Sequence, residues 1–552
     1  MSSNSLHEAP PRESLPTRPR PKVTPSQWPA WWHFTAVVAA LAALAAVFPI
    51  GCILHSGWTH PTPRWGDEWL STIMLTDPSL THMMRALCDA INTSPPLYFL
   101  LGRVWVLLAG DSSLDLRMFS SLTFVAAFLV MIDALRRPFG FWPALIGVSV
   151  AFFKCNAVCA HNAEVRFYGM LVAAAALLIW CFSRVTADTR GRPPARWLIA
   201  EAFATAILLM THYVGLLLLP IFFAGHVIDQ LSRRRFDPRP FAALVAGTVP
   251  FLFWLPVFRI HQTIPQDWLL IPTGHDLLWN LGYNFRSPAL IWGVLAATCV
   301  ALYILLRTVG SLAGSTPSGD DHRATGLLAV GWLYVAFPLG VWIFSRIAHP
   351  LFHERYIFHA LLGWAIVLAH LMAIIVRQLR QLAQMPRWSA SAMVLRAGAA
   401  LAGILLITSS VRTFLQRSSH PFVLVTPLTE SPPQQSLPIA MFDSDTFWAS
   451  RETSPARDRI CLVLDTDVWR SLPKSRGGNS AVAILTAVHR EYPQLPIVLS
   501  GDFLAGHPQF LFFSPDDSPW LQSRIVAGGR YTCTPLPCPD GNLYFVSRLG
   551  PS

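Results

Sequence analysis

Charged residues are scarce in this chain. Only 13% of its 552 residues are Asp, Glu, Lys or Arg, whereas 53% are hydrophobic. An average soluble protein carries about 25% charged residues, so the composition excludes an ordinary soluble domain. Long uncharged runs alternate with short polar segments along the chain. This alternation predicts an α-helical polytopic membrane protein.

Acidic residues are the scarcer of the two signs. The chain has 31 Asp and Glu against 42 Lys and Arg, a formal net charge of +11. The basic residues lie mostly in short clusters between apolar runs, without a basic face interleaved with stacking aromatic side chains. We therefore interpret them as signals of membrane topology and expect no nucleic-acid partner.

Cysteines are few and scattered, and no zinc-type spacing occurs among the nine. Those in or beside apolar runs are expected to be small buried hydrophobes: Cys52, Cys155, Cys159, Cys181 and Cys299. Cys533 and Cys538 are separated only by Thr-Pro-Leu-Pro. In an oxidising compartment they would form a disulfide, and two free thiols are the alternative.

Apolar runs predict about eleven membrane spans between residues 34 and 411. Residues 1–33 are rich in Pro, Ser and Arg and are expected to form a disordered cytoplasmic tail. The run 34–54 is long enough to cross a hydrocarbon core of about 30 Å, and it lies too far from the N-terminus for a cleaved signal. The other predicted spans are centred in 117–135, 141–158, 166–183, 197–212, 214–231, 240–258, 289–306, 326–345, 357–376 and 393–411.

Basic clusters on alternate loops orient these spans. The positive-inside rule places the clusters in the cytoplasm, and the opposite loops outside, including an outer loop over 55–115. The apolar segment 95–108 within this loop is short and interrupted by Arg103. If it crossed the membrane, every later basic loop would lie outside. We therefore expect an interfacial or re-entrant helix there.

Residues 412–552 have a different pattern. Apolar runs shorten and predict a small extracytoplasmic α/β domain. Strands are expected at 461–465, 497–499, 510–513 and 543–546, and a helix at 481–492.

The pentapeptide Trp65-Gly66-Asp67-Glu68-Trp69 is the strongest candidate for chemistry. Adjacent carboxylates repel each other, so at a membrane interface one can keep a raised pKa while the other stays an ionised proton acceptor. Such a pair can act as a general base. The alternative is an exposed acidic turn flanked by interfacial tryptophans.

Two further outer segments combine Glu with Arg. The first contains Glu164, Arg166 and Tyr168, with Glu164 and Tyr168 expected one helical turn apart and Arg166 pointing elsewhere. The second runs through His349 and His353-Glu354-Arg355-Tyr356. Charges that face lipid are costly, so these sets are expected to face a protein cavity. His212-Tyr213 has no such charges, and we interpret it as part of an interfacial aromatic belt.

The Glu and Arg sets on one membrane face indicate a site that takes up a proton and stabilises an anion. A guanidinium group stays charged and binds two oxygens of a phosphate at once, and a membrane supplies lipid phosphates.

The order of these motifs resembles the GT-C membrane glycosyltransferases, in the bacterial branch similar to dolichyl-phosphate-mannose protein mannosyltransferases. The resemblance covers about residues 34–376. The motifs that carry it are, in order, Asp67-Glu68, Pro95-Pro96-Leu97-Tyr98, Arg117-Met118-Phe119-Ser120-Ser121, Glu164-Val165-Arg166-Phe167-Tyr168, Thr211-His212-Tyr213 and Glu354-Arg355-Tyr356.

The resemblance implies transfer of a single sugar from a polyprenyl-phosphate-linked donor to a hydroxyl of an envelope glycolipid, glycan or protein. The reaction would take place at the outer face of a bacterial inner membrane, with the N-terminus cytoplasmic. Asp67 would be the general base, with Glu68 its neighbour. The residues implied in substrate binding are Glu164, Arg166, Tyr168, His353, Arg355, Tyr356, Pro95, Pro96 and Tyr98.

The chain departs from the family pattern at Ser94, where relatives often have His before the Pro-Pro pair. A phosphate or metal contact through that His is therefore not implied here, although His161 or His353 could replace it. No cofactor is certain. A divalent cation, Mg²⁺ or Mn²⁺, is compatible with the carboxylates, but no spacing requires it.

Two other functional classes remain open. A transporter or flippase of a lipid-linked glycan would place ionisable groups near the bilayer midplane and show paired repeats, whereas most charges here lie at span ends. A non-catalytic scaffold for envelope assembly would bind partners through residues 412–552.

Overall fold

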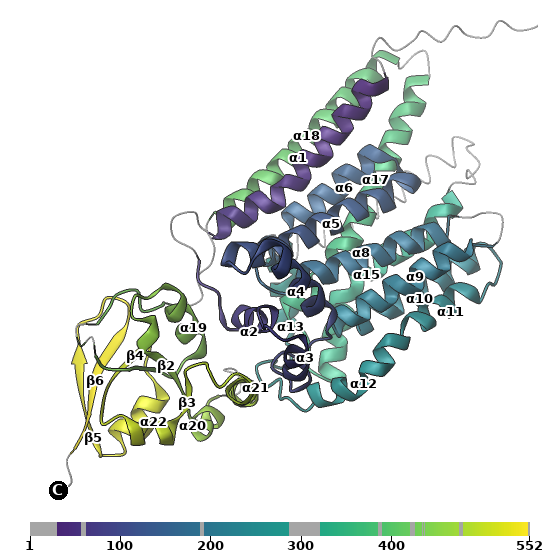
Figure 1. Ribbon diagram of the computed structural model, residues 1–552. Helices are drawn as coiled ribbons and strands as arrows, with labels where there is room; N and C mark the ends of the chain where they lie inside the picture. The colour runs from purple at the N-terminus through teal and green to yellow at the C-terminus, as the bar shows by residue number, and fades with distance from the viewer. Residues whose placement is uncertain are drawn as a thin grey trace, which may run out of the picture. The chain divides into compact units, whose positions relative to one another are not determined.

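The computed structural model describes residues 30–56, 62–187, 192–285, 321–384, 389–419, 426–432, 434, 436–473 and 478–549 (Figure 1). The predicted fold class is confirmed: the protein is a helical polytopic membrane protein with a small α/β region towards its C-terminus. Most of the predicted tail, and the predicted span 289–306, lie outside the described residues.

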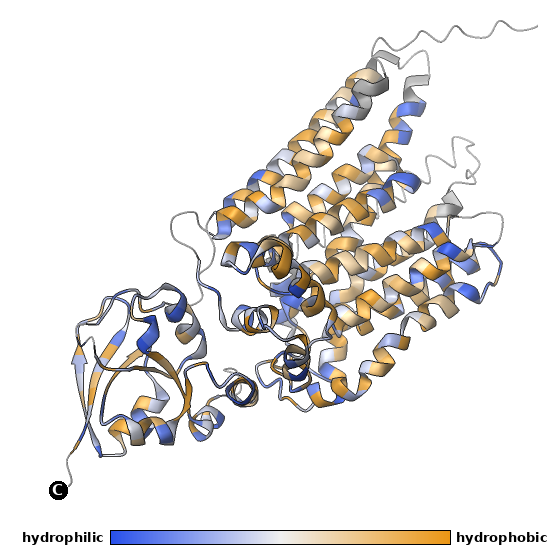
Figure 2. Cartoon of the chain, in the orientation of Figure 1, coloured by the Kyte–Doolittle hydropathy of each residue, from blue (hydrophilic) through white to orange (hydrophobic). Residues whose placement is uncertain are grey.

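Apolar helices form most of the chain (Figure 2). Eight helical segments within the described ranges are long and apolar enough to cross a membrane. They are contained in α1 (Ala30–Ser56), α5 (Ser113–Phe139), α8 (Tyr168–Val185), α10 (Val214–Ser232), α11 with α12 (Arg239–Gly247 and Val249–His261), α15 (Asp321–Ile347), α17 (Ala360–Gln384) and α18 (Ser389–Ser418).

Two predicted spans differ from the structure in length or continuity. The span 141–158 is too long, because α6 (Phe141–Lys154) ends where Cys155 turns extended, with φ −70° and ψ 118°. A short helix, α7 (Asn156–His161), follows it. The span 240–258 is divided between α11 and α12, with a proline in the first turn of α12, where a missing N–H is tolerated. Helix α9 (Ala195–Thr211), with 17 residues, agrees with the predicted span 197–212.

Helix α4 (Leu97–Ala109) occupies the predicted interfacial segment. Its 13 residues rise about 20 Å at 1.5 Å each, less than a bilayer core. The guanidinium of Arg103, the residue that interrupts the apolar run, donates hydrogen bonds to the backbone carbonyls of Asp77 and Pro78. The charge is thus held by the backbone of residues 77–78.

Helices α6 and α17 pack closely because a glycine lies between them. A Cβ atom added to Gly147 would lie 2.6 Å from the backbone N of Ala369 and 2.9 Å from the carbonyl O of Ala365. Small residues allow such close approach of membrane helices. A cluster of phenylalanines fills the adjoining core: Phe48, Phe124, Phe128, Phe152, Phe153 and Phe414.

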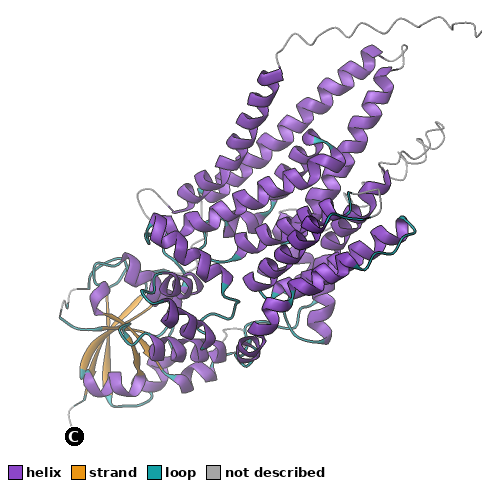
Figure 3. Cartoon of the chain, turned by 45° about the vertical axis from the view of Figure 1, so that its right-hand side comes forward, coloured by secondary structure: helices purple, strands orange, loops and turns teal. Residues whose placement is uncertain are grey.

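The C-terminal region is built on a six-stranded sheet (Figure 3). The strand order is β3-β2-β1-β4-β6-β5, with the first four strands parallel and the last two antiparallel to their neighbours. The strands are β1 (Ile439–Met441), β2 (Ile460–Leu464), β3 (Ile497–Leu499), β4 (Gln509–Ser514), β5 (Tyr531–Leu536) and β6 (Asn542–Arg548).

The sequence predicted four of these strands and missed β1 and β5. Strand β1 has three residues, too few for a pattern, and β5 is an edge strand containing Pro535. The sheet carries α19 (Ser444–Thr453), α20 (Thr466–Ser471), α21 (Gly478–Glu491), α22 (Ser500–Gly506) and the π-helical turn η4 (Leu521–Val526). Of the two alternatives for Cys533 and Cys538, the structure has free thiols.

Short helices connect the ends of the membrane helices on the side where the candidate residues gather. They are α2 (Gly66–Leu75), α3 (Leu80–Cys88), α13 (Gly274–Phe285) and α16 (Glu354–Ile357).

Candidate active site

Asp67 lies in the first turn of α2, between two arginines from distant parts of the chain. Its Oδ2 is 3.4 Å from Nη2 of Arg166 and 3.3 Å from Nη1 of Arg355. Arg166 also donates to the carbonyl O of Asp67 and to the Ser71 hydroxyl of the same helix. The side chain of Asp67 stays 32% exposed. An accessible carboxylate and two guanidinium groups therefore meet at one point.

Glu68 has a different environment from its neighbour. It is buried, and its Oε1 accepts the backbone N–H of Val165 at 2.9 Å. Its Oε2 accepts the N–H of Trp65, the N-cap residue of α2, and lies 3.5 Å from Nη2 of Arg117. Burial raises the pKa of Glu68 above its ordinary value. With both oxygens engaged, Glu68 fixes the start of α2.

The segment before α8 is a turn, so the predicted helical spacing of Glu164 and Tyr168 is wrong. The backbone N–H of Arg166 donates to the carbonyl O of Glu164 at 2.7 Å, and α8 begins only at Tyr168. This tight turn directs Arg166 towards Asp67 and leaves its guanidinium 5.9 Å from the centroid of the Tyr168 ring, so the prediction that Arg166 points away from Tyr168 is wrong.

Glu164 is paired with His161, whose Nδ1 lies 2.8 Å from its Oε2. Burial raises the pKa of Glu164, but His161 and the nearby arginines outweigh it and lower that pKa overall. The ring of His161 in turn lies 4.3 Å from that of Tyr168. Glu164 and Tyr168 thus lie near the two arginines, and within the described ranges neither side chain forms a hydrogen bond with Asp67.

Helix α16 places Arg355 beside Asp67. His353 caps this helix, because its Nδ1 accepts the backbone N–H of Arg355. The Arg355 guanidinium lies over the Trp65 ring, 4.5 Å from its centroid. Burial, reinforced by the charge of Arg355, lowers the pKa of His353 to about 3, so this imidazole is neutral near pH 7.

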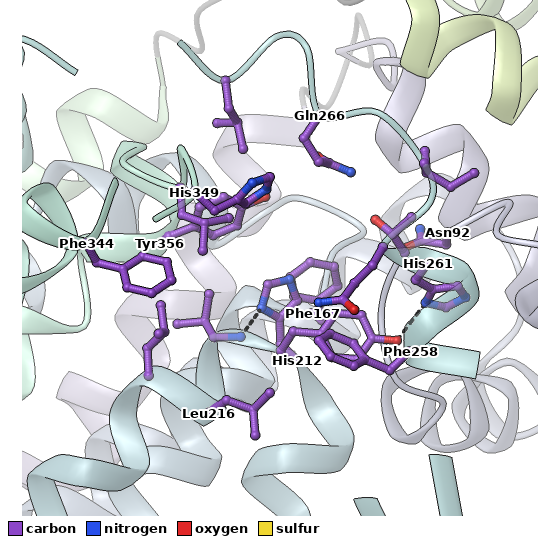
Figure 4. A pocket seen from close by; sticks show the side chains of 18 of the residues that line it. Asn92, Phe167, His212, Leu216, Phe258, His261, Gln266, Phe344, His349 and Tyr356 are labelled. Carbon is purple, nitrogen blue, oxygen red and sulfur yellow. Dashed lines mark hydrogen bonds between the residues drawn. The ribbon is translucent and has the colours of Figure 1, made fainter. Parts of the chain in front are cut away.

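A cavity of about 470 Å³ adjoins this group (Figure 4). Arg166 and Tyr356 line it, and so connect it to the surroundings of Asp67. Its other walls mix rings, amides and aliphatic side chains: Asn92, Thr93, Phe167, His212, Tyr213, Val214, Leu216, Leu217, Phe258, His261, Gln262, Ile264, Gln266, Leu269, Phe344, His349 and Leu351.

His212 and Tyr213 belong to this cavity, so their interpretation as an interfacial belt is wrong. The His212 ring stacks on Phe167 at 4.2 Å, and its Nδ1 accepts the backbone N–H of Val214. The hydroxyl of Tyr213 donates to Nδ1 of His261 at 2.6 Å. Because the chain is extended at His212, with φ −160° and ψ 148°, both rings turn inward between α9 and α10.

This chain is similar in sequence to one protein family and in fold to known structures. Residues 93–259 match the family model described as dolichyl-phosphate-mannose-protein mannosyltransferase. The crystal structure of ArnT from Cupriavidus metallidurans bound to undecaprenyl phosphate is similar over 95% of this chain and 100% of that chain, with a TM-score of 0.54 and 13% identity. The chain has the GT-C fold.

The same ArnT in its apo state matches 94% of this GT-C chain and 100% of its own, with a TM-score of 0.52 and 13% identity. No curated protein matches the sequence. The predicted resemblance to GT-C enzymes is confirmed, and so is the predicted enzyme class, a glycosyltransferase.

The remaining predicted residues of the GT-C motifs lie beside the cavity. Pro96 is the N-cap of α4, preceded by Pro95. Tyr98 is fully buried, and its ring packs edge-on against that of Phe167. Phe167 in turn stacks on His212, which lines the cavity. None of these three motif residues lines the cavity itself. Of the three, Tyr98 supports the cavity wall through its contact with Phe167.

Sequence reasoning missed several residues of the site. Arg117 opens one of the family motifs but was assigned no role. It is only 1% exposed and pairs with Glu68, and its position at the start of an apolar run was the available signal. His261 gave a weaker signal, at the end of a span. Asp445, which accepts the backbone N–H of Gly66 at 2.8 Å, gave none, because it lies 379 residues away.

Within the described ranges, no group of three or more His, Cys, Asp or Glu side chains is placed to hold a metal ion. The divalent cation therefore stays a prediction.

Proposed function

We propose that this GT-C protein transfers a single sugar from a polyprenyl-phosphate donor to a hydroxyl of an envelope glycolipid, glycan or protein, with Asp67 as the general base. The observation that carries the proposal is the position of Asp67. Its accessible carboxylate is held by Arg166 and Arg355, and Arg166 also lines the adjoining cavity.

In the proposed reaction the acceptor oxygen attacks the anomeric carbon of the donor. The new bond forms as the bond from that carbon to the phosphate oxygen breaks. The hydroxyl proton passes to Asp67, and the electron pair leaves with the lipid phosphate. Arg166 and Arg355 stabilise the charge on the departing phosphate.

The contacts of the two arginines support this division of roles. Each guanidinium lies more than 3.2 Å from Oδ2 of Asp67, so neither forms a short bidentate pair with it. Donor N–H groups of both remain for a phosphate. In the cavity, amides and rings such as Asn92, Gln266 and Tyr356 suit a sugar, which offers hydroxyls and apolar faces.

The lipid part of the donor is proposed to lie against α4. Leu107 and Leu108 on this helix are 77% and 80% exposed, an apolar surface next to the outer segment that carries Asp67. The similar ArnT structure contains undecaprenyl phosphate, which supports a polyprenyl phosphate here. The outer side of a bacterial inner membrane is the compartment proposed for the reaction.

Mass spectrometry of envelope glycans tests the proposal in a deletion strain of the producing organism. The strain is rescued with the native chain, with Asp67→Asn or with the control Asp276→Asn, at matched membrane abundance. Asp276 is a suitable control because, among the residues that the structure describes, its carboxylate accepts hydrogen bonds only from the neighbouring Thr273.

We expect one sugar unit to disappear on deletion and to return with the native chain and Asp276→Asn, but not with Asp67→Asn. Full rescue by Asp67→Asn would contradict the assignment and favour a transporter or a scaffold.

A further inference from the structure

The C-terminal sheet region places a third carboxylate at the start of α2. Asp445, in the first turn of α19, accepts the backbone N–H of Gly66 at 2.8 Å. Gly66 is the first residue of α2 and immediately precedes Asp67. A free N–H at a helix start needs an acceptor, and here a side chain from a distant part of the chain supplies it.

Asp445 approaches Gly66 closely. A Cβ atom added at position 66 would lie 2.4 Å from Oδ1 of Asp445. A larger residue there must therefore displace the Asp445 carboxylate.

One face of α19 makes three contacts with the segment around Asp67. Asp445, Trp448 and Glu452 are spaced by three and four residues, so they lie on the same side of the helix. The Trp448 ring stacks on Trp69 of α2 at 5.2 Å and 18°. Glu452 accepts the backbone N–H and the Nε–H of Arg64, at 2.8 Å and 3.1 Å.

A second set of contacts holds the far end of the same outer segment. The Tyr492 hydroxyl donates to Oδ2 of Asp77 at 2.8 Å, and Glu491 pairs with Arg85 of α3 at 2.7 Å. The sheet region therefore binds this segment both around Asp67, at residues 64–69, and further along it, at Asp77 and Arg85.

We propose that Asp445 is a positioning residue of the active site, which fixes the first turn of α2 and so the carboxylate of Asp67. The C-terminal region is then an integral part of the transferase centre, and not only a module for partners. This inference rests on the proposed function of Asp67.

The charges around Asp445 give the role a pH signature. Burial raises the pKa of Asp445, and the neighbouring carboxylates of Asp443 and Asp67 raise it further. The Gly66 N–H and the charge of Arg355 lower it, which leaves a pKa of about 7. Above this pH a second negative charge lies beside Asp67 and stabilises the proton that the site accepts. We therefore expect the turnover of the native enzyme to rise through about pH 7.

The test uses the full-length protein purified in lipid nanodiscs and a lipid extract of the producing organism as donor. Release of polyprenyl phosphate is measured from pH 5.5 to 8.5 for the native chain, Asp445→Ala, Asp445→Asn and Asp502→Asn. Asp502 is a matched control, because it is an exposed first-turn aspartate of α22 in the same sheet region.

We expect kcat of Asp445→Ala to fall by about 10²-fold, the effect of misplacing a reacting group by about 1 Å, with KM for the lipid donor nearly unchanged. Asp445→Asn keeps an acceptor for Gly66 and retains more activity, but loses the rise near pH 7. Asp502→Asn behaves like the native chain. Thermal melting and gel filtration establish that each variant is folded.

Native kcat and an unchanged pH profile in both Asp445 variants would overturn the inference. If Asp445→Ala does not fold, the pH profile of Asp445→Asn alone decides. Asp67→Asn is measured in parallel: if it is fully active, the proposed function fails, whereas an inactive Asp67→Asn beside fully active Asp445 variants overturns only the role of Asp445.

Discussion

Asp67 and Glu68 are adjacent in sequence, yet their carboxylates have opposite surroundings. Asp67 is accessible and faces two arginines, whereas Glu68 is buried against Arg117 and two backbone amides. The first arrangement leaves a carboxylate available to a substrate, and the second stabilises a helix start. One helical turn thus combines a chemical group with its support.

Removal of Glu68 should destabilise the protein more than removal of the Asp67 charge. In Glu68→Ala the buried Arg117 loses its carboxylate partner, a change that typically costs about 3–5 kcal/mol. Glu68→Gln keeps an acceptor for the Val165 N–H and should lose less. Thermal denaturation in detergent checks this order, with Asp67→Asn as the near-native control. Equal melting temperatures for Glu68→Ala and Asp67→Asn would contradict it.

Single residues also show where sequence reasoning reaches its limit. Asp67, Arg166 and Arg355 were selected because carboxylates and guanidinium groups at span ends are unusual enough to notice. Their mutual distances depend on the turn at 162–167. The sequence could not predict this turn, because a turn has no hydrophobic periodicity.

Among the helices, length and hydropathy decided what was predictable. Long apolar runs such as those of α5 and α10 were located within a few residues, because any helix there must satisfy its backbone inside the membrane. The end of α6 and the division between α11 and α12 depend on local turns within apolar sequence. The hydropathy pattern does not change at these turns and therefore could not predict them. Strand β1, with three residues, is defined only by its neighbours in the sheet.

The contact between α6 and α17 gives a prediction for these elements. A methyl group in Gly147→Ala meets the backbone of α17 at 2.6 Å, so the helices must separate, at a typical cost of about 1–3 kcal/mol. Gly340→Ala in α15 is the control, because nothing lies within 4 Å of an added Cβ there. We expect a lower melting temperature for Gly147→Ala alone. An unchanged value would mean that α6 and α17 are packed less closely.

At the scale of the whole molecule, the segment of residues 62–92 is held between the membrane helices and the C-terminal sheet region. Arg166 and Arg355, which lie at the ends of membrane helices, contact α2 on one side. Asp445 and Trp448 of the sheet region contact α2 on the other. The sequence predicted both parts but not their contacts, since these join residues almost 400 positions apart.

Ionisation of Asp445 should lower the stability of the folded protein, because the charge is buried beside Asp443 and Asp67. Its pKa in the folded protein is raised from 3.8 to about 7, so its stabilising contribution is complete below about pH 4 and is lost as the pH rises through about 7. We expect the melting temperature of the native chain to fall between pH 6 and pH 8, and to fall less in Asp445→Asn. Parallel curves for the two proteins would exclude a titration of Asp445 in this range.

The central proposal is that Asp67 is the general base of a glycosyl transfer. The most direct test measures the breakage of the bond between sugar and phosphate. The purified protein is incubated with a lipid extract of the producing organism, and free polyprenyl phosphate is followed by mass spectrometry. We predict its release by the native chain, slowed about 10²- to 10⁴-fold in Asp67→Asn, the usual cost of losing a positioned base. Equal release by both proteins, or none by the native chain while it still moves the intact donor across liposome membranes, would contradict the account.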